Sequence, residues 1–414
     1  MLFRSASLFA FCWLSLGAVA AAEAPRLVPV SGGRIKLLGA GDGTGVSRAT
    51  IVDDLPLAHT AQLLPLDKQG ELVGGADAAA QAIQVFKNLG AALSAAGSSL
   101  EVVVKLNLYV AEESLAVEIE RVVAQTFRGE VRPASSLVVS RLSHAGALVA
   151  ADAVAIAEPG GAPREVSLHR SPALAASALH AHAAVLPAGQ RIYVSGQAEP
   201  GDLKAATRKT LEGLRSTLEF LGRTDRDIVQ LKAFVTPMSA ADDVRQVIVE
   251  FFGERESPPL ALVEWESTAP VEIELIAAGG PAGNEHRKLP SKVDFLTPPG
   301  MKASPVFSRV ARIAGGPTIY TSALSGGKAA DANGQVEAIF ASLADLLKAA
   351  DSDLQHLAKA TYYVADEDAS RALNELRPKY FDPARPPAAS KAMVRGIGRT
   401  GKTIALDMIA VPAR

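Results

Sequence analysis

Apolar residues follow two spacings along this chain. Residues 78–97 carry apolar side chains three to four positions apart, which predicts one buried face of a helix. The residues at this spacing are Ile83, Phe86, Leu89 and Leu93. Residues 147–157, 271–279 and 403–411 instead alternate as strands of a sheet do when helices cover one face. The pattern therefore predicts an α+β protein.

The same order of elements occurs three times. Three sets of residues recur at offsets of 125 and 129 positions. They are Pro133, Pro258 and Pro387; Phe127, Phe252 and Phe381; and Val110, Val235 and Val364. A shared register over so long a block indicates a tandem repeat, in which each copy is one structural unit.

Each copy predicts one small domain. A strand enters a turn, at HTAQLLP (59–65), VSGQAEP (194–200) and TSALSGG (321–327), and a helix follows. Residue types that tolerate a left-handed conformation end this helix, namely Gly97, Gly222 and Asp351. A central strand, a second helix and two closing strands complete the unit. We place the domains at 47–157, 168–279 and 302–412, joined by connectors rich in glycine and proline.

The order of these motifs resembles the Rid (YjgF) family, from the SGQ turn to the passages RPASSLVV and VEIE. The resemblance implies a chorismate-mutase-like fold, in which two helices back a mixed β-sheet. Family members are homotrimers whose sheets form a central barrel, with pockets at the subunit interfaces. Three fused copies therefore imply an intramolecular pseudo-trimer around a β-barrel core.

The resemblance also implies an activity, the hydrolysis of 2-imino and enamino acids to 2-keto acids and ammonia. An arginine, third in a Pro-Ala-Arg-Ser motif, clamps the substrate carboxylate in the family. That position holds Ser135, Leu260 and Ala389 here. Losing such a contact costs about 2–5 kcal/mol of binding. Four arginines lie nearby in sequence, and we interpret them as surface residues: Arg132, Arg141, Arg385 and Arg395.

Other family positions survive in part. The acidic residue of the last strand is Glu274 in the second copy and Asp407 in the third, and the first copy has Val154. A family asparagine is retained as Asn374, with Glu120 and Arg245 as its counterparts. Glu274, Asp407 and Asn374 are therefore the candidate catalytic residues. The candidate substrate-binding residues are those of the turns: Ser195, Gly196, Gln197, Thr60 and Ser322. We interpret Lys105 and Lys359, with Gln230 between them, as ordinary strand residues.

The first 22 residues differ from the rest of the chain. They combine an early charge at Arg4, a short apolar stretch and small residues, which predicts a signal peptide cleaved near Ala20–Ala22. The mature protein is then secreted or periplasmic, with no membrane anchor. Cys12, the one cysteine, lies in this segment, so the mature chain has no disulfide, thiolate metal site or cysteine nucleophile.

Charge narrows the possible partners. The 42 basic and 44 acidic residues leave no basic patch for nucleic acid. His180 and His182 could share a strand face, but no third metal ligand accompanies them. We therefore expect a small-molecule partner, no metal, no cofactor, no nucleic acid, and a monomer acting as a pseudo-trimer.

Three functions are compatible with these observations. The first is an exported binding protein with degenerate pockets for a small carboxylate or carbonyl ligand, and weak or no deaminase activity. The second is a divergent imine or enamine deaminase with a different carboxylate clamp. The third and weakest is an endoribonuclease.

Overall fold

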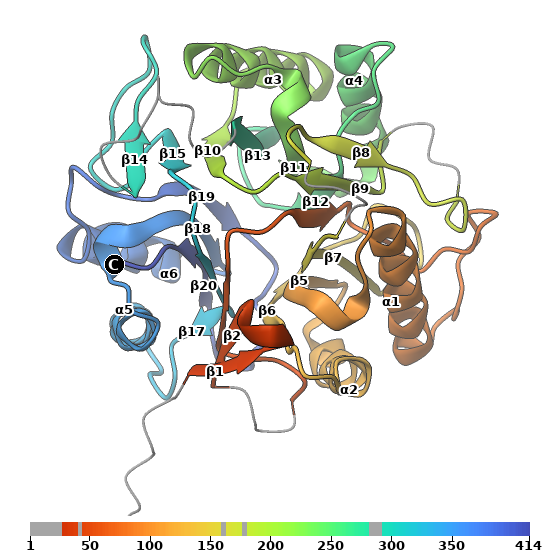
Figure 1. Ribbon diagram of the computed structural model, residues 1–414, viewed down its shortest axis with the longest axis horizontal. Helices are drawn as coiled ribbons and strands as arrows, with labels where there is room; N and C mark the ends of the chain where they lie inside the picture. The colour runs from red at the N-terminus through yellow and green to blue at the C-terminus, as the bar shows by residue number, and fades with distance from the viewer. Residues whose placement is uncertain (1–26, 40–43, 159–162, 176–179, 281–291) are drawn as a thin grey trace, which may run out of the picture.

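The computed structural model describes residues 27–39, 44–158, 163–175, 180–280 and 292–414. The predicted signal peptide, with Cys12, lies outside the described residues. Three units, each with two helices on the outside and strands on the inside, surround a common interior (Figure 1). The α+β class predicted from the sequence is confirmed.

The first helix of each unit begins and ends in the same way. These helices are α1 (Ala78–Ala95), α3 (Leu203–Phe220) and α5 (Ala332–Ala349). Asp77, Asp202 and Asp331 cap them, each accepting a hydrogen bond from a backbone N–H three residues later. The predicted left-handed residues follow, with φ of 69° at Gly97, 66° at Gly222 and 56° at Asp351.

The remaining elements of each unit also correspond. The central strands are β5 (Val103–Val110), β11 (Ile228–Val235) and β18 (Leu357–Val364). The second helices are α2 (Ala116–Thr126), α4 (Ala241–Phe252) and α6 (Glu367–Leu376). Strands β6 (Ala134–Val139), β12 (Leu260–Glu264) and β19 (Ala388–Met393) run parallel to the central strands. Strands β7 (Val149–Ile156), β13 (Val271–Gly280) and β20 (Ile404–Ala410) run antiparallel to them.

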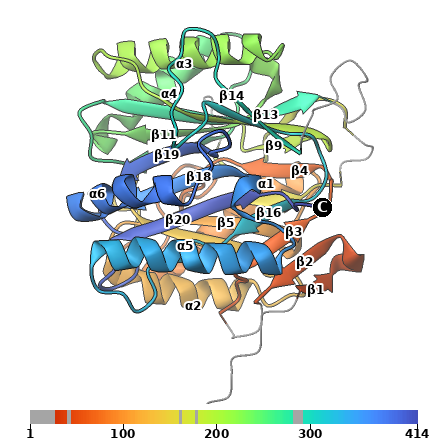
Figure 2. The ribbon, with the colours of Figure 1, turned by 90° about the vertical axis from the view of Figure 1, so that its left-hand side faces the viewer.

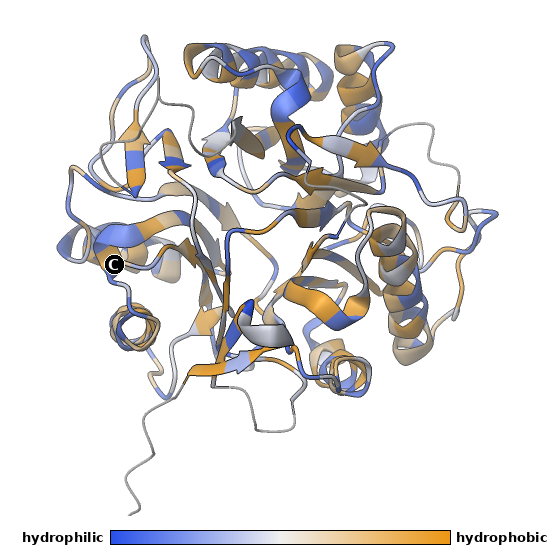
Figure 3. Cartoon of the chain, viewed as in Figure 1, coloured by the Kyte–Doolittle hydropathy of each residue, from blue (hydrophilic) through white to orange (hydrophobic). Residues whose placement is uncertain are grey.

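Helices cover the outer face of each sheet. Figure 2 shows α5 and α6 lying over the strands of the third unit. Apolar residues gather on the strands and on the helix faces turned toward them, while polar residues face outward (Figure 3). One predicted core residue is wrong: Ile83 is 59% exposed, because Ala82, Val85 and Phe86 form the inward face of α1.

The first strand of each unit pairs with the second strand of a neighbouring unit. The first strands are β3 (Ala49–Val52), β9 (Ala183–Leu186) and β15 (Val310–Ile313). The second strands are β4 (Leu57–Thr60), β10 (Gln190–Gln197) and β16 (Thr318–Thr321). Strand β9 pairs with β4, β15 with β10, and β3 with β16. Each unit therefore completes the sheet of another unit.

Short outer strands extend the three sheets. They are β8 (Ser167–His169), β14 (Val293–Leu296), and the hairpin of β1 (Leu27–Val30) and β2 (Ile35–Leu38); β17 (Leu324–Ser325) pairs with β20. The two six-stranded sheets each come from one continuous stretch of the chain. The eight-stranded sheet instead joins residues 27–52 to residues 318–410. The N-terminal strands thus close the ring of units. Among the described residues the ladders form three separate sheets, so the barrel core stays a prediction.

An ion pair between a buried arginine and a partly exposed aspartate joins the three units where the exchanged strands meet. Arg191, fully buried on β10, donates to Asp54 Oδ1 of the first unit at 2.8 Å and to the carbonyl of Gly316 of the third unit at 3.1 Å. Asp54 also accepts from the backbone N–H groups of Gly189 and Gly316, each at 2.9 Å. Gly189 and Gly316 have φ of 114° and 88°, which favour glycine.

Equivalent residues from all three units meet in the interior. Tyr109, Phe234 and Tyr363, one from each central strand, belong to one apolar cluster. A second cluster combines the equivalent residues Val104 and Val229 of the first two units with Tyr320 of the third, which comes from a different strand of its unit. No helix in the described part of the chain is long and apolar enough to cross a membrane.

Candidate functional site

The three positions that lack arginine lie where the units touch. The N–H of Ser135 donates to Ser322 Oγ of the third unit at 2.7 Å. The carbonyl of Leu260 accepts from the N–H of Gln62 of the first unit at 3.0 Å. The N–H of Ala389 donates to Ser195 Oγ of the second unit at 2.7 Å. Each contact joins the turn of one unit to the parallel strand of another.

Most predicted substrate-binding side chains form structural hydrogen bonds. Thr60 Oγ1 accepts from the N–H of Ala153 at 2.9 Å, and Ser322 Oγ also donates to the carbonyl of Ser47 at 2.6 Å. Gln197 Nε2 donates to Thr217 Oγ1 at 2.9 Å inside its own unit. These residues align the turns and the strands, and ligand binding by them stays a prediction.

Three of the four nearby arginines have partners elsewhere. Arg141 and Arg395 both form ion pairs with Glu264, at 3.6 and 3.8 Å. The guanidinium of Arg385 lies over the ring of Phe295. Among the described residues, neither the ion pairs nor the ring contact directs these arginines toward Ser135, Leu260 or Ala389.

A pocket of about 310 Å³ lies between the first and second units. Gln62 lines it from the turn of the first unit, and Arg245 from α4 of the second. Arg245 donates to Asp242 Oδ1 at 2.7 Å and to Ser143 Oγ of the first unit. Arg245 is the counterpart of the family asparagine, so the comparison of the three repeats identified the position but not that a guanidinium there would line this pocket.

Three histidines line the same pocket as Arg245. Burial, together with the charge of Arg245, lowers the pKa of His180 to about 3, so its imidazole is neutral. His182 Nδ1 accepts from the N–H of Ser171 at 3.0 Å, which places the proton of the neutral ring on Nε2. His144 Nδ1 is buried without a hydrogen-bond partner. The described residues contain no group of three metal-ligating side chains that could hold a metal ion.

Glu272, which the sequence analysis missed, lies at the contact between the second and third units. A Cβ atom at Gly196 would stand 1.9 Å from Glu272 Oε1, so the carboxyl group requires the glycine of the SGQ turn. Oε1 is buried without a hydrogen-bond partner. Burial and the neighbouring Glu274 raise the pKa of Glu272 to about 7, against the opposing effects of Ser390 and Lys359. Alternation in VEIE puts Glu272 on the same strand face as Glu274, which was the available signal.

We expect Glu272 to give folding a measurable pH dependence. A carboxyl whose pKa rises from 4.5 to about 7 on folding holds its proton more tightly in the native state. Its contribution is therefore full below pH 4.5 and is lost as the pH rises through 7, on the order of 3 kcal/mol in total. In urea unfolding, Glu272→Gln should resemble the wild type at pH 5 and be the more stable protein at pH 8. Exposed Glu212→Gln is the control, and an equal difference for Glu272→Gln at both pH values would contradict the assignment.

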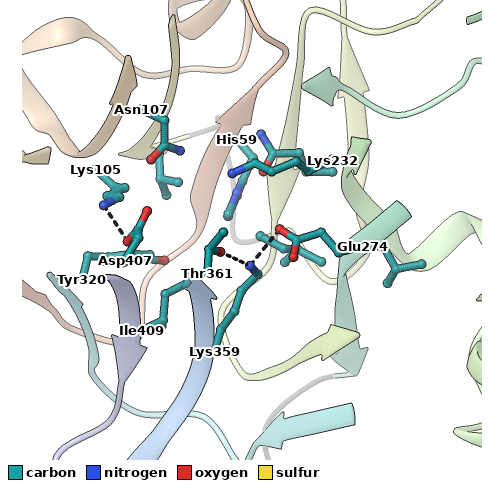
Figure 4. A pocket seen from close by; sticks show the side chains of 14 residues that line it. His59, Lys105, Asn107, Lys232, Glu274, Tyr320, Lys359, Thr361, Asp407 and Ile409 are labelled. Carbon is teal, nitrogen blue, oxygen red and sulfur yellow. Dashed lines mark hydrogen bonds and ion pairs between the residues drawn. The ribbon is translucent and has the colours of Figure 1, made fainter. Parts of the chain in front are cut away.

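Two of the three candidate catalytic residues meet in a cavity of about 50 Å³ in the interior (Figure 4). Lys105 Nζ donates to Asp407 Oδ1, and Lys359 Nζ to Glu274 Oε1, both at 2.8 Å. The lysines that we interpreted as ordinary strand residues are thus cations of buried pairs between different units. The third candidate, Asn374, is exposed on α6 and accepts from Lys391 Nζ at 3.3 Å.

The assignment of Val154 as the counterpart of Glu274 and Asp407 is wrong. Strand register pairs Lys232 with Glu274, Thr361 with Asp407, and Asn107 with Asp152. Asp152 is therefore the equivalent carboxylate of the first unit. Its oxygens accept from Asn107 Nδ2 at 2.8 Å and from the hydroxyl of Tyr109 at 2.6 Å.

Comparison with known proteins gives consistent matches in all three units. The family model described as "Endoribonuclease L-PSP" matches residues 47–157, 171–279 and 303–411. A RutC family protein of Pyrococcus horikoshii, PH0854, is 39% identical over 105 residues, which are 22% of this chain and 82% of that protein.

Solved structures of single-unit proteins also match. The Rid family protein YyfB of Yersinia pestis is 26% identical over 30% of this chain and 98% of its own, with a TM-score of 0.28. The yeast protein YEO7 is 30% identical over 27% of this chain and 86% of its own, with a TM-score of 0.24.

Proposed function

The chain belongs to the Rid/YjgF family, whose model is described as "Endoribonuclease L-PSP", and we propose that it binds a small carboxylate or carbonyl ligand with weak or no deaminase activity. The proposal places the ligand in the pocket between the first and second units. Export of the mature protein, also proposed, comes from the sequence pattern of residues 1–22.

We further propose that the three units act as an intramolecular pseudo-trimer around a barrel core. The contacts between units support this arrangement, because Gln62 of the first unit bonds Leu260 of the second, Ser195 of the second bonds Ala389 of the third, and Ser322 of the third bonds Ser135 of the first. This order is cyclic and leaves no unit without two neighbours.

The observation that carries the binding proposal is the guanidinium of Arg245 in the interface pocket. Its side chain is only 14% exposed and is held by Asp242 of its own helix and Ser143 of the first unit. A largely buried guanidinium that lines an open pocket attracts a carboxylate or a carbonyl oxygen. Uncharged imidazole and amide groups beside it complete a polar wall suited to a small ligand.

Arg245→Gln should weaken binding of such a ligand. A hydrogen bond to a charged group contributes about 1.5–3 kcal/mol, so we expect the Kd for pyruvate, chosen as the probe, to rise about 10- to 100-fold. Isothermal titration calorimetry of the mature chain gives the measurement. Arg371→Gln is the matched control, because Arg371 also pairs with an aspartate three residues earlier but is 64% exposed. Equal Kd values for Arg245→Gln and wild type would contradict the proposal.

A divergent deaminase is the second candidate, and Glu272 is the observation that favours it. A carboxyl group with a pKa of about 7 could accept a proton from an attacking water near neutral pH. Ammonia release from freshly generated 2-iminopropanoate distinguishes the two functions. If ammonia is released at the rate of a single-unit family member, and Glu272→Gln abolishes this release, the protein is a deaminase and the binding proposal is wrong.

A further inference from the structure

Lys232 differs from the other two lysines of the interior cavity. Lys105 Nζ donates to Ser136 Oγ, to the carbonyl of Thr321 and to Asp407 Oδ1, at 2.6 to 2.8 Å, which uses all three of its N–H groups. Lys359 Nζ donates to Glu274 and Thr361. Within the described residues Lys232 makes no hydrogen bond or ion pair, and no dashed line reaches it in Figure 4.

The amino group of Lys232, which has no partner among the described residues, is also buried. Lys232 is 9% exposed and lines the same cavity as the two paired lysines. A buried ammonium group without a hydrogen-bonding partner costs several kcal/mol. A native fold that retains it therefore indicates an occupant that accepts its hydrogen bonds.

Two further lining residues have unused polar atoms. Both ring nitrogens of His59, and Asn107 Oδ1, are buried without a hydrogen-bond partner in the part of the chain that the structure describes. Burial and the charge of Arg191 lower the pKa of His59 to about 3, so the neutral ring offers one donor and one acceptor. The occupant thus meets a cation and a neutral donor, which together suit an oxygen anion.

The charges around Lys232 leave its ammonium group available. Glu274 and Asp407 line the cavity, but their carboxylates bond Lys359 and Ser390, and Lys105, respectively. Asp152 lies behind the lining residue Asn107, and its carboxylate accepts from Asn107 and Tyr109. Burial opposes the charge of Lys232, but Tyr109, Tyr363, Asp152 and Glu274 raise its pKa above the usual value. Among the described residues, no carboxylate lies within ion-pair distance of Lys232, so its amino group stays available to an occupant of the cavity.

We propose that this cavity is a binding site for one small oxyanion, of the size of formate or bicarbonate, held by Lys232 and His59. The volume of about 50 Å³ exceeds the 10–15 Å³ or so that one water requires and excludes a ligand the size of a nucleotide. The site is separate from the interface pocket of Arg245, with none of its lining residues in common.

Formate binding is measured in the Arg245→Gln variant, called the host below, because this variant lacks the guanidinium of the interface pocket. Binding in the host therefore reports on the interior cavity. Titration of 13C-labelled formate, followed by NMR, should show saturable binding in the host. Adding Lys232→Gln should weaken this binding at least tenfold, whereas adding Lys209→Gln, on the exposed face of α3, should leave it unchanged. Circular dichroism confirms that each variant is folded.

Crystals of the wild-type mature chain soaked in bromide give a second measurement that needs no variant. An anomalous peak beside Lys232 Nζ supports the site. Formate binding that is insensitive to Lys232→Gln, or a cavity that holds only water in the bromide-soaked crystal, overturns the proposal. Neither measurement depends on whether pyruvate binds at Arg245. The interior site and the interface pocket can therefore be confirmed or contradicted independently.

Discussion

Asp54→Ala should lower the free energy of unfolding by about 3–5 kcal/mol, the effect of leaving one partner of a buried ion pair uncompensated. Arg191 is fully buried and would keep only its hydrogen bonds to Gly316 and Thr318. The N–H groups of Gly189 and Gly316 would lose their acceptor as well. Urea unfolding at neutral pH gives the measurement.

The matched control is Asp368→Ala. Asp368 also pairs with an arginine, but both side chains are largely exposed, so its loss should cost less than about 1 kcal/mol. Asp54→Ala combined with Arg191→Met should recover part of the loss, because the buried charge is then removed as well. A loss from Asp54→Ala no larger than that from Asp368→Ala would show that the pair does not hold the three units together.

Repetition made the unit predictable from sequence. The aspartates that cap the first helices and the left-handed residues that follow them recur at the offsets of the proline motif. Such local rules depend on a few adjacent residues, and the sequence contains all of them. Ile83 shows the limit of this reasoning, because its helical spacing fits, yet Ala82, Val85 and Phe86 define the face of α1 that packs inward.

The strand exchange could not be predicted in this way. Residues 49–60 have the pattern of a hairpin, and β3 would present the same apolar face to β4 of its own unit or to β16 of another. Periodicity identifies a strand but does not choose its partner. The buried contacts of Asp54 with Arg191 and Gly316 involve residues more than a hundred positions apart, which no local pattern reveals.

The candidate site could be predicted only in part, for the same reason: Glu274 and Asp407 of the interior cavity were identified from the sequence, but their partners were not. Val154 lies two positions from Asp152, and only the register of β7 with the central strand shows that Asp152 is the equivalent carboxylate. Lys105 and Lys359 occupy the same position of the repeat, and the second copy has Gln230 there. Lys232 lies two residues further along, so the repeat pattern does not identify it. Which of the three lysines lacks a partner depends on side chains from different units, and therefore on the assembled interior.

The second large effect concerns closure of the ring. Removing residues 23–52 from the mature chain should leave no folded monomer, because strand β16 then loses its neighbour β3. The deletion also removes a set of buried aliphatic side chains, namely Val30, Ile35, Leu37, Leu38, Ile51 and Val52. At about 1.5–3 kcal/mol each, their loss is comparable to the whole stability of a typical domain, about 5–15 kcal/mol.

The exposed edge of β16 gives this prediction a specific outcome. An unpaired strand edge accepts another strand, so the shortened chain should associate into larger species in size-exclusion chromatography with light scattering. A synthetic peptide of residues 27–52 should restore the monomeric complex, since it supplies β1, β2 and β3. A peptide with the same composition in scrambled order should not. A shortened chain that stays monomeric, with the melting temperature of the full mature protein, would mean that β3 does not close the ring and that the three units hold together without it.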